Sequence, residues 1–262
     1  MNLEHGHVWF PQHQRSQWFH ERYDQAASQV VELFGSNFLS LTGKAVADIG
    51  CGDGIIDLGV FRRVSPGRLV GFDLRPVDTR LLSRLATEEG HSGELPTGLE
   101  FRTSSAGKLD ADDESFDFVF SWSAFHHLQN PRGAIHEVRR ILRAEGALMI
   151  QLYPFFSSPH GSLLEQWYPE GFAQLRHTEE EITATVRSDP GQDPAWAEHL
   201  LESNRKLNRV TLDELGDMLT DEGLRVTRLQ VIGEDAPIPP EVATRPLSQL
   251  GIGGVKLLAV RD

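Results

Sequence analysis

An apolar segment that runs directly into a glycine-rich turn is the feature that most constrains this chain. The segment is Ala45–Ile49, and the turn that follows has glycine at 50, 52 and 54. A second apolar segment, Arg68–Leu74, begins about twenty residues later and carries Asp73 near its end. Glycines let the backbone approach a ligand closely, and an acid at the end of a second strand can accept hydrogen bonds from ribose hydroxyls. The pattern predicts an open α/β sheet that holds a nucleoside.

Apolar strands and amphipathic helices alternate along most of the chain. This alternation favours right-handed crossovers and a mainly parallel sheet. The expected strands are 45–49, 68–74, 99–103, 116–122, 147–152, 224–231 and 255–260, and the expected helices are 14–34, 53–64, 76–89, 131–142 and 211–221.

Residues 154–210 interrupt the alternation. They are rich in aromatic residues, proline and histidine, and they are too many for a plain connection in a compact domain. We expect a lid or substrate-binding insertion there. The resulting division is an N-terminal helical cap over residues 1–43 and a main domain over residues 44–262 that contains the insertion.

Composition narrows the class of partner. The 262 residues carry 25 Lys and Arg against 38 Asp and Glu, a net charge of −13, which argues against a nucleic-acid partner. No apolar run is long enough to cross a bilayer, and the N-terminus lacks the basic and apolar blocks of a signal peptide. Cys51 is the single cysteine, which fits a reducing cytoplasm. We therefore expect a cytoplasmic protein with no membrane partner; the sequence leaves the oligomeric state open, a homodimer included.

Three later stretches carry further motifs in the order of one enzyme family. They are Ser104–Asp117, Ser121–Pro131 and Glu137–Ile150. Together with the glycine turn they resemble the class I S-adenosyl-L-methionine (SAM)-dependent methyltransferases, specifically the methyltransferase type 11-like domain. The resemblance covers residues 44–150 and implies a Rossmann-like α/β fold, a mostly parallel seven-stranded sheet with helices on both faces. It also implies SAM as the cofactor and S-adenosyl-L-homocysteine (SAH) as the product.

The resemblance also implies which residues contact the cofactor. Asp73 would accept from the ribose hydroxyls, and Asp48 would organise the turn or bind the ammonium group through water. Family members often carry Asp where Ser105 stands, so we expect Ser105 and the backbone of Ala106 to hold the adenine edge. The full set of expected cofactor contacts is Asp48, Gly50, Cys51, Gly52, Gly54, Asp73, Leu74, Ser105, Ala106 and Ser121.

Other residues of the turn have simpler interpretations. We expect Cys51 to be packed inside the turn rather than to act as a reactive thiol. We expect Asp53 to cap the following helix and Asp57 to lie on its solvated face.

Three histidines follow the ends of predicted strands and are candidates for a catalytic base: His126, His127 and His160. A base assists methyl transfer to a hydroxyl, typically by about 10²–10⁴-fold. We therefore expect transfer to a small-molecule or glycan-like acceptor, at oxygen more than at nitrogen. A hydrogen-bonded structural role is the alternative for each histidine.

Other interpretations stay open at this point. They are N- or C-methylation of a small molecule, a non-catalytic SAM- or SAH-binding protein, an RNA or protein methyltransferase, and a dinucleotide-dependent oxidoreductase, which the glycine spacing disfavours. We expect no metal site, because His5, His7, His13 and His20 match no strong ligand spacing. Aromatic residues near the N-terminus and in the insertion could line a pocket, with ordinary packing between the N-terminal helix and the lid as the alternative for about half of them. They are Trp9, Phe10, Trp18, Phe19, Phe155, Phe156, Trp167 and Tyr168.

Overall fold

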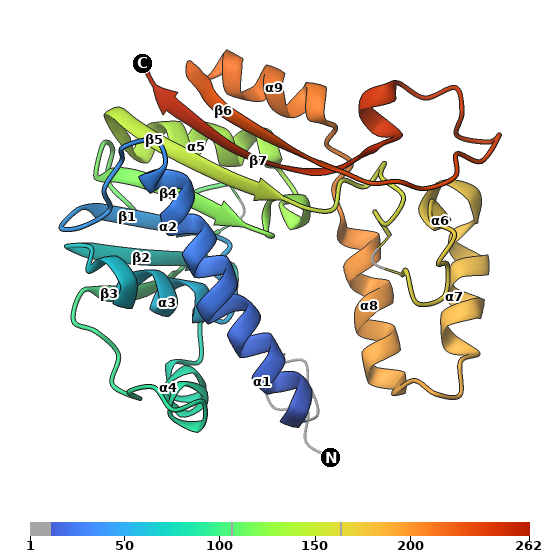
Figure 1. The fold of residues 1–262 in the computed structure, drawn as a ribbon, viewed down its shortest axis with the longest axis horizontal. Coiled ribbons are helices and arrows are strands. Elements are labelled where there is room, and N and C mark those ends of the chain that lie inside the picture. Colours follow the sequence, from blue (N-terminus) through green and yellow to red (C-terminus); the bar gives the residue numbers. More distant parts are fainter. Residues whose placement is uncertain (1–11, 106, 163) are drawn as a thin grey trace.

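The computed structural model describes residues 12–105, 107–162 and 164–262. Within them the chain forms a seven-stranded sheet in the order β3-β2-β1-β4-β5-β7-β6 (Figure 1). The strands are β1 (Ala45–Ile49), β2 (Arg68–Asp73), β3 (Leu99–Thr103), β4 (Phe116–Trp122), β5 (Leu142–Leu152), β6 (Leu224–Gly233) and β7 (Ile252–Arg261).

Most of the sheet is parallel. β1 pairs in parallel with β2 and β4, and β4 pairs in parallel with β5, whereas β7 runs antiparallel to both β5 and β6. The parallel strands therefore end at one edge, where ligands bind in open α/β sheets. This architecture confirms the expected Rossmann-like class I methyltransferase fold.

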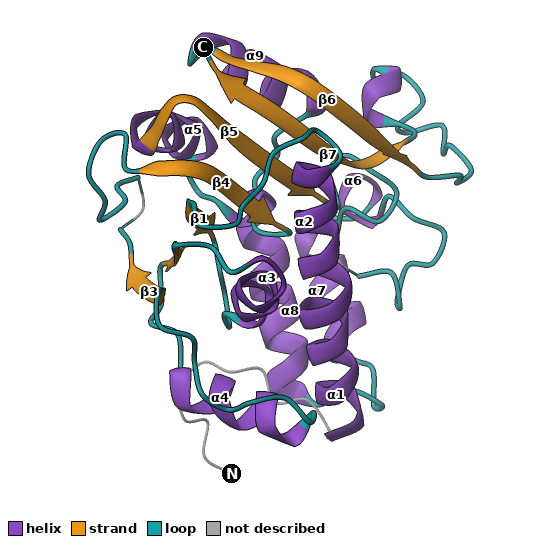
Figure 2. Cartoon of the chain, turned by 60° about the vertical axis from the view of Figure 1, so that its left-hand side comes forward, coloured by secondary structure: helices purple, strands orange, loops and turns teal. Residues whose placement is uncertain are grey.

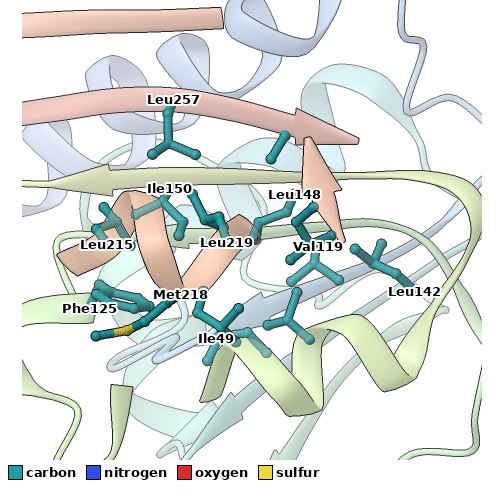
Figure 3. Close-up of a cluster of buried hydrophobic side chains, with 14 of the residues drawn as sticks. Ile49, Val119, Phe125, Leu142, Leu148, Ile150, Leu215, Met218, Leu219 and Leu257 are labelled. Carbon is teal, nitrogen blue, oxygen red and sulfur yellow. The ribbon is translucent and has the colours of Figure 1, made fainter. Parts of the chain in front are cut away.

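Helices cover both faces of the sheet (Figure 2). On one face α2 (Ala27–Gly35) and α3 (Ile55–Val64) share an apolar cluster with strands β1, β2 and β4. On the other face α5 (Pro131–Ile141) and α9 (Leu212–Asp221) pack against the sheet. Figure 3 shows this second cluster, in which Met218 and Leu219 of α9 lie over Ile49 and Val119. Packing of helices on both faces of the sheet fixes the positions of the strand ends, where the site lies.

The N-terminal helix lies along the first face. It is one continuous run of helical turns made of α1 (Gln12–His20), a π-helical segment η1 (Glu21–Ala26) and α2, close to the expected helix at 14–34. Its middle packs with α3 and α4 (Thr79–Glu88) through Phe19, Tyr23 and Leu82.

The segment between β5 and α9, here called the insertion (residues 154–210), is mostly helical. It contains α6 (Ala173–Arg176), α7 (Glu179–Arg187) and α8 (Pro194–Lys206). Figure 1 shows α7 and α8 side by side, extending away from the sheet. The insertion has an apolar cluster of its own, which includes Leu164, Tyr168, Ile182 and Leu201.

The aromatic residues do not gather in one pocket. Phe19 belongs to the cluster of the N-terminal helix, Phe155 to the α5–α9 cluster, and Tyr168 to the cluster of the insertion. Each therefore packs locally, as the alternative of ordinary packing expects, and these three residues do not share one pocket. Trp9 and Phe10 lie outside the described residues.

Several boundaries differ from the sequence expectation, and two of them have a clear structural reason. β5 begins at Leu142, five residues before the expected start, because the pairing of β4 with β5 includes Phe116 with Leu142 before a register shift. Helix α3 begins at Ile55 with Gly54, in the left-handed region, as its N-cap. Asp53 still contributes, since its Oδ1 accepts from the Ile55 N–H at 3.1 Å.

Candidate active site

The glycine turn is held against the end of β2. The N–H groups of Gly50 and Cys51 both donate to the Phe72 carbonyl, at 2.8 and 3.1 Å. All three turn glycines have positive φ, and a Cβ on Gly50 would lie 2.4 Å from the Cβ of Ala124. A Cβ on Gly52 would meet no atom within 4 Å, so this glycine borders open space. The turn thus presents bare backbone to a ligand at position 52.

Asp73 lies directly beside that open backbone. Its Oδ2 accepts from the Gly52 N–H at 3.0 Å, and its Oδ1 accepts from the Arg75 N–H at 3.1 Å. A carboxylate offers about four acceptor positions, so two remain for a ligand. The next residue, Leu74, is 56% exposed and supplies apolar surface at the same edge. This arrangement fits a ribose diol with an adjoining flat base.

Four carboxyl groups surround the buried thiol of Cys51. Burial, followed by the charges of Asp57, Asp48, Asp73 and Asp53, raises the pKa of that thiol above its ordinary value. Cys51 is therefore a packed thiol rather than a reactive one. A concentration of negative charge at one strand edge favours a cationic ligand.

Asp48 and Asp57 are the two innermost members of this group. Both are buried, and the charge of Asp57 acts on Asp48. Within the described residues, Oδ1 of Asp48 and both side-chain oxygens of Asp57 have no hydrogen-bond partner. Burial raises the pKa of both, that of Asp57 to about 8, so the pair retains a proton near neutral pH. The expectation that Asp57 lies on a solvated helix face is wrong, because α3 packs against the N-terminal helix and this packing buries the first two turns of α3.

Three other residues that were expected to contact the cofactor lie outside the glycine turn. Ser121 is buried, and its hydroxyl donates to the Ile49 carbonyl at 2.9 Å, which ties β4 to β1. Ser105 is exposed, just beyond the end of β3, and its hydroxyl donates to the Lys108 carbonyl. Its neighbour Ser104 donates its N–H to the Asp73 carbonyl at 2.8 Å, which holds this loop beside the site. Ala106 lies outside the described residues.

Two of the three candidate histidines occupy the turn η2 (Phe125–His127) after β4. Their rings lie 4.2 Å apart. His126 is buried, and its Nδ1 has no hydrogen-bond partner among the described residues. Burial, together with the neighbouring His127, lowers its pKa to about 3. His127 is exposed on the surface, although surrounding protein atoms and His199 lower its pKa. At neutral pH both rings are uncharged, and His127 is the more accessible.

The third candidate, His160, belongs to the insertion. It lies in the loop after β5, it is half-buried, and its Nδ1 has no hydrogen-bond partner.

Helix α8 contributes a residue that the sequence reasoning missed. Burial lowers the pKa of His199, and the charge of Arg75 lowers it further. His199 in turn lowers the pKa of His127, so the three side chains interact electrostatically. A histidine in the middle of an amphipathic helix gives no local signal of this kind. Its contacts indicate that α8 lies near the loops after β2 and β4.

The end of the insertion is fastened to the histidine turn. Asn208 donates its side-chain amide to the carbonyls of Phe125 and Leu128, at 2.8 and 2.9 Å. The side chain of Gln129 donates to the Lys206 carbonyl at 2.9 Å. These bonds hold the carboxyl end of α8 beside η2.

The N-terminal helix also reaches the glycine turn. Nε1 of Trp18 donates to Oδ2 of Asp53 at 2.8 Å. No group of three or more metal-ligating side chains occurs in the described part of the chain. His20 pairs with Asp24 instead, and His5 and His7 lie outside the described residues. Among the described helices, none has the length and apolarity that a bilayer span requires.

Comparison with known proteins agrees with this geometry. A family model described as "Methyltransferase domain" matches residues 47–150. A phthiotriol/phenolphthiotriol dimycocerosates methyltransferase of Mycobacterium leprae is 32% identical over 126 residues, which cover 48% of this chain and 40% of the relative. A tRNA U34 carboxymethyltransferase of Aliarcobacter butzleri is 27% identical over 118 residues, 44% of this chain and 36% of the relative. The chain thus spans about two fifths of these curated relatives.

A solved structure extends the likeness over nearly the whole fold. A SAM-dependent methyltransferase from Aquifex aeolicus superposes with a TM-score of 0.51 at 16% identity, over 97% of this chain and all of the other. The fold, the glycine turn and the family match agree: the chain has the class I SAM-dependent methyltransferase fold, and its residues 47–150 match the methyltransferase domain.

Proposed function

We propose that this protein binds SAM at the glycine turn and transfers its methyl group to an oxygen atom of a small-molecule or glycan-like acceptor. The observation that supports this most is the open backbone of Gly52 beside the half-free carboxylate of Asp73. The cofactor supplies an electrophilic methyl group on a positively charged sulfur, and the surrounding carboxyl groups attract such a cation.

In this proposal each residue of the turn has a distinct task. Gly52 offers backbone without a side chain, and Asp73 accepts from the ribose hydroxyls with its remaining lone pairs. Leu74 packs against the base, while Ser105 and Ala106 border its edge. Asp48, protonated together with Asp57, stiffens the turn from below. Gly50, Cys51, Gly54 and Ser121 hold the shape of the pocket through packing and the β1–β4 bond.

The acceptor is bound on the side of the histidine turn. Methyl transfer by in-line displacement needs the acceptor oxygen held opposite the sulfur, and such positioning contributes roughly 7–11 kcal/mol in well-oriented reactions. We assign the general base to His127, because it is uncharged at neutral pH and accessible. His126 is the weaker candidate, since its buried ring and its pKa of about 3 disfavour proton uptake. His160 remains a candidate from the insertion.

The insertion acts as a lid in this account. Its α8 helix couples electrostatically to the loops after β2 and β4, and its end is bonded to η2. Residues 1–43 serve as the helical cap, with Trp18 bonded to the turn. A single buried thiol is consistent with a cytoplasmic location.

A second candidate acceptor is RNA, because one of the relatives modifies tRNA. The net charge of −13 weighs against it. Methyl-tritiated SAM separates these proposals when it is incubated with the protein and three acceptor pools: small hydroxylated compounds, total tRNA and unfolded protein. We expect label in the first pool. Label confined to tRNA or to protein would contradict the proposed acceptor, and SAH binding without any transfer would indicate a non-catalytic binding protein.

A further inference from the structure

A cavity of about 350 Å³ lies away from the glycine turn. Its walls come from four segments that are distant in sequence: the loop after β5, helix α6, the residues just before and at the start of α9, and the loop between β6 and β7. The lining residues that matter here are Phe156, Gln174, Leu175, Arg209 and Arg245. A volume of this size is typical of sites for small organic molecules.

Two arginines line this one cavity. The guanidinium of Arg209 lies over the Phe156 ring, 4.9 Å from its centroid, and Arg245 donates to the side chain of Gln249 at 3.2 Å. Neither shares an ion pair with a carboxylate in residues 12–105, 107–162 and 164–262. Other arginines of the chain, such as Arg63, Arg140 and Arg143, do form such pairs.

This pairing pattern is unexpected from the charge balance. The chain has 38 acidic residues for 25 basic ones, so a basic side chain readily finds an acidic neighbour. Two guanidinium groups that share a cavity, with no carboxylate partner among the described residues, leave donors for an external anion beyond the one that Arg245 gives to Gln249. A guanidinium presents a planar set of donors that matches carboxylate and phosphate oxygens in pairs.

The rest of the lining fits an organic anion better than a bare inorganic one. Phe156 and Leu175 supply apolar surface. Gln174 donates its amide to the carbonyls of Phe156 and Ser158, at 2.6 and 2.8 Å, whereas its buried Oε1 has no partner in the part of the chain that the structure describes. A hydroxyl group on a ligand would satisfy that acceptor.

We propose that this cavity is a second ligand site, which binds a small organic carboxylate or phosphate through Arg209 and Arg245, with its apolar part against Phe156 and Leu175. The site is separate from the glycine turn and does not depend on the methyl-transfer proposal. Because Phe156 and Arg209 stand near opposite ends of the insertion, a bound anion also links those two ends.

Phenyl phosphate and benzoate test this site, with benzyl alcohol as a neutral probe of similar shape. We expect calorimetric titration to show saturable binding of at least one anion to the intact protein. The alcohol should bind at least about tenfold more weakly, since a hydrogen bond to a charged group is worth about 1.5–3 kcal/mol. Comparison of the two anions distinguishes phosphate from carboxylate recognition.

Variants assign the binding to the two arginines. The double variant Arg209→Ala/Arg245→Ala should weaken the anion at least about tenfold. Arg80→Ala, which removes an exposed arginine of α4, should leave the affinity unchanged. Should the double alanine variant fail to fold, Arg209→Lys/Arg245→Lys keeps the charge, loses the paired donor geometry and should also bind more weakly.

Two results would overturn the proposal. One is the absence of binding of both anions to the intact protein, and the other is unchanged affinity in the double variants. SAH affinity, measured on the same samples, should be the same in all of them, so a failure at this cavity is distinguishable from a failure at the glycine turn.

Discussion

Asp48 and Asp57 are both buried beside the glycine turn, and the charge of Asp57 raises the pKa of Asp48 after burial does. Asp48 lies in β1, the strand that leads into the turn, and Asp57 lies in the first turn of α3. Two ionised carboxylates buried together would repel each other, so the pair retains a proton. The turn therefore rests on a buried acid pair, and its stability depends on pH.

The sign of that dependence follows from the raised pKa values. The native state of Asp57 has a pKa of about 8, above the ordinary value of 3.8, so the folded protein binds more protons than the unfolded chain within this window. This contribution to stability is present at low pH and is lost as the pH rises through about 8. We expect the free energy of unfolding to fall by more than about 1 kcal/mol between about pH 5 and about pH 8.

Asp57→Asn tests this dependence, because the amide keeps the shape of the side chain and does not titrate. Urea unfolding across the pH range should show a flatter profile for this variant than for the unchanged protein. Asp217→Asn, on the exposed surface of α9, is the matched control and should retain the decline. Equal declines in all three proteins would show that the acid pair carries no linked proton.

Gly52→Ala should separate ligand binding from folding. Gly52 and Gly43 both have positive φ, 58° and 71°, and a Cβ on either meets no atom within 4 Å. Each alanine variant should therefore lose a similar stability, about 1–2 kcal/mol, from left-handed backbone strain. Only Gly52→Ala places a methyl group at the site, and only it should weaken SAH binding, by at least about tenfold. Equal SAH affinities in the two variants would show that the ligand does not bind at this part of the turn.

His127→Ala should lower the rate of methyl transfer to an acceptor oxygen by about 10²–10⁴-fold, because it removes the proposed base. SAH affinity should stay unchanged, and the pH–rate profile should lose its acidic limb. His126→Ala should mainly reduce stability, since that ring is buried. A normal rate and profile in His127→Ala would shift the base to His160 or exclude a histidine base.

Asn208→Ala should loosen the insertion. The variant removes the side-chain donor to the carbonyls of Phe125 and Leu128, although the Phe125 carbonyl keeps its bond from the Leu128 N–H. A carbonyl that stays buried and unpaired costs about 1–3 kcal/mol. Hydrogen exchange should accelerate in residues 125–128 and in the last turn of α8. Glu202→Ala breaks an exposed ion pair with Lys206 on the same helix and should change neither. Exchange that is equal in the two variants would contradict the fastening role of Asn208.

The sequence was sufficient for most of the sheet. β1, β3 and β4 occupy the expected residues. β1 and β4 are nearly continuous apolar runs bounded by turns, which are typical of buried parallel strands. The glycine turn and Asp73 were likewise predicted to adjoin, and the Gly52–Asp73 hydrogen bond shows that they do. Such features depend on short stretches of sequence, so the sequence pattern is enough to predict them.

Features that depend on distant contacts were missed. Asp57 looked solvated because the periodicity of α3 does not reveal that the N-terminal helix covers it. His199 lies more than seventy residues from His127, and only the fold places it near that ring. The cavity around Arg209 and Arg245 arises from four separate segments, so no local pattern could indicate it.

Calorimetric titration of SAH into the unchanged protein and into Asp73→Ala tests the central claim most directly, with Asp217→Ala as a control for loss of an acidic side chain. We predict saturable binding to the unchanged protein and the control, and affinity at least about tenfold lower in Asp73→Ala, since a hydrogen bond to a charged group contributes about 1.5–3 kcal/mol. Thermal melting confirms that the variant is folded. A folded Asp73→Ala protein that binds SAH as tightly as the unchanged one, or an unchanged protein that binds no SAH, would contradict the account.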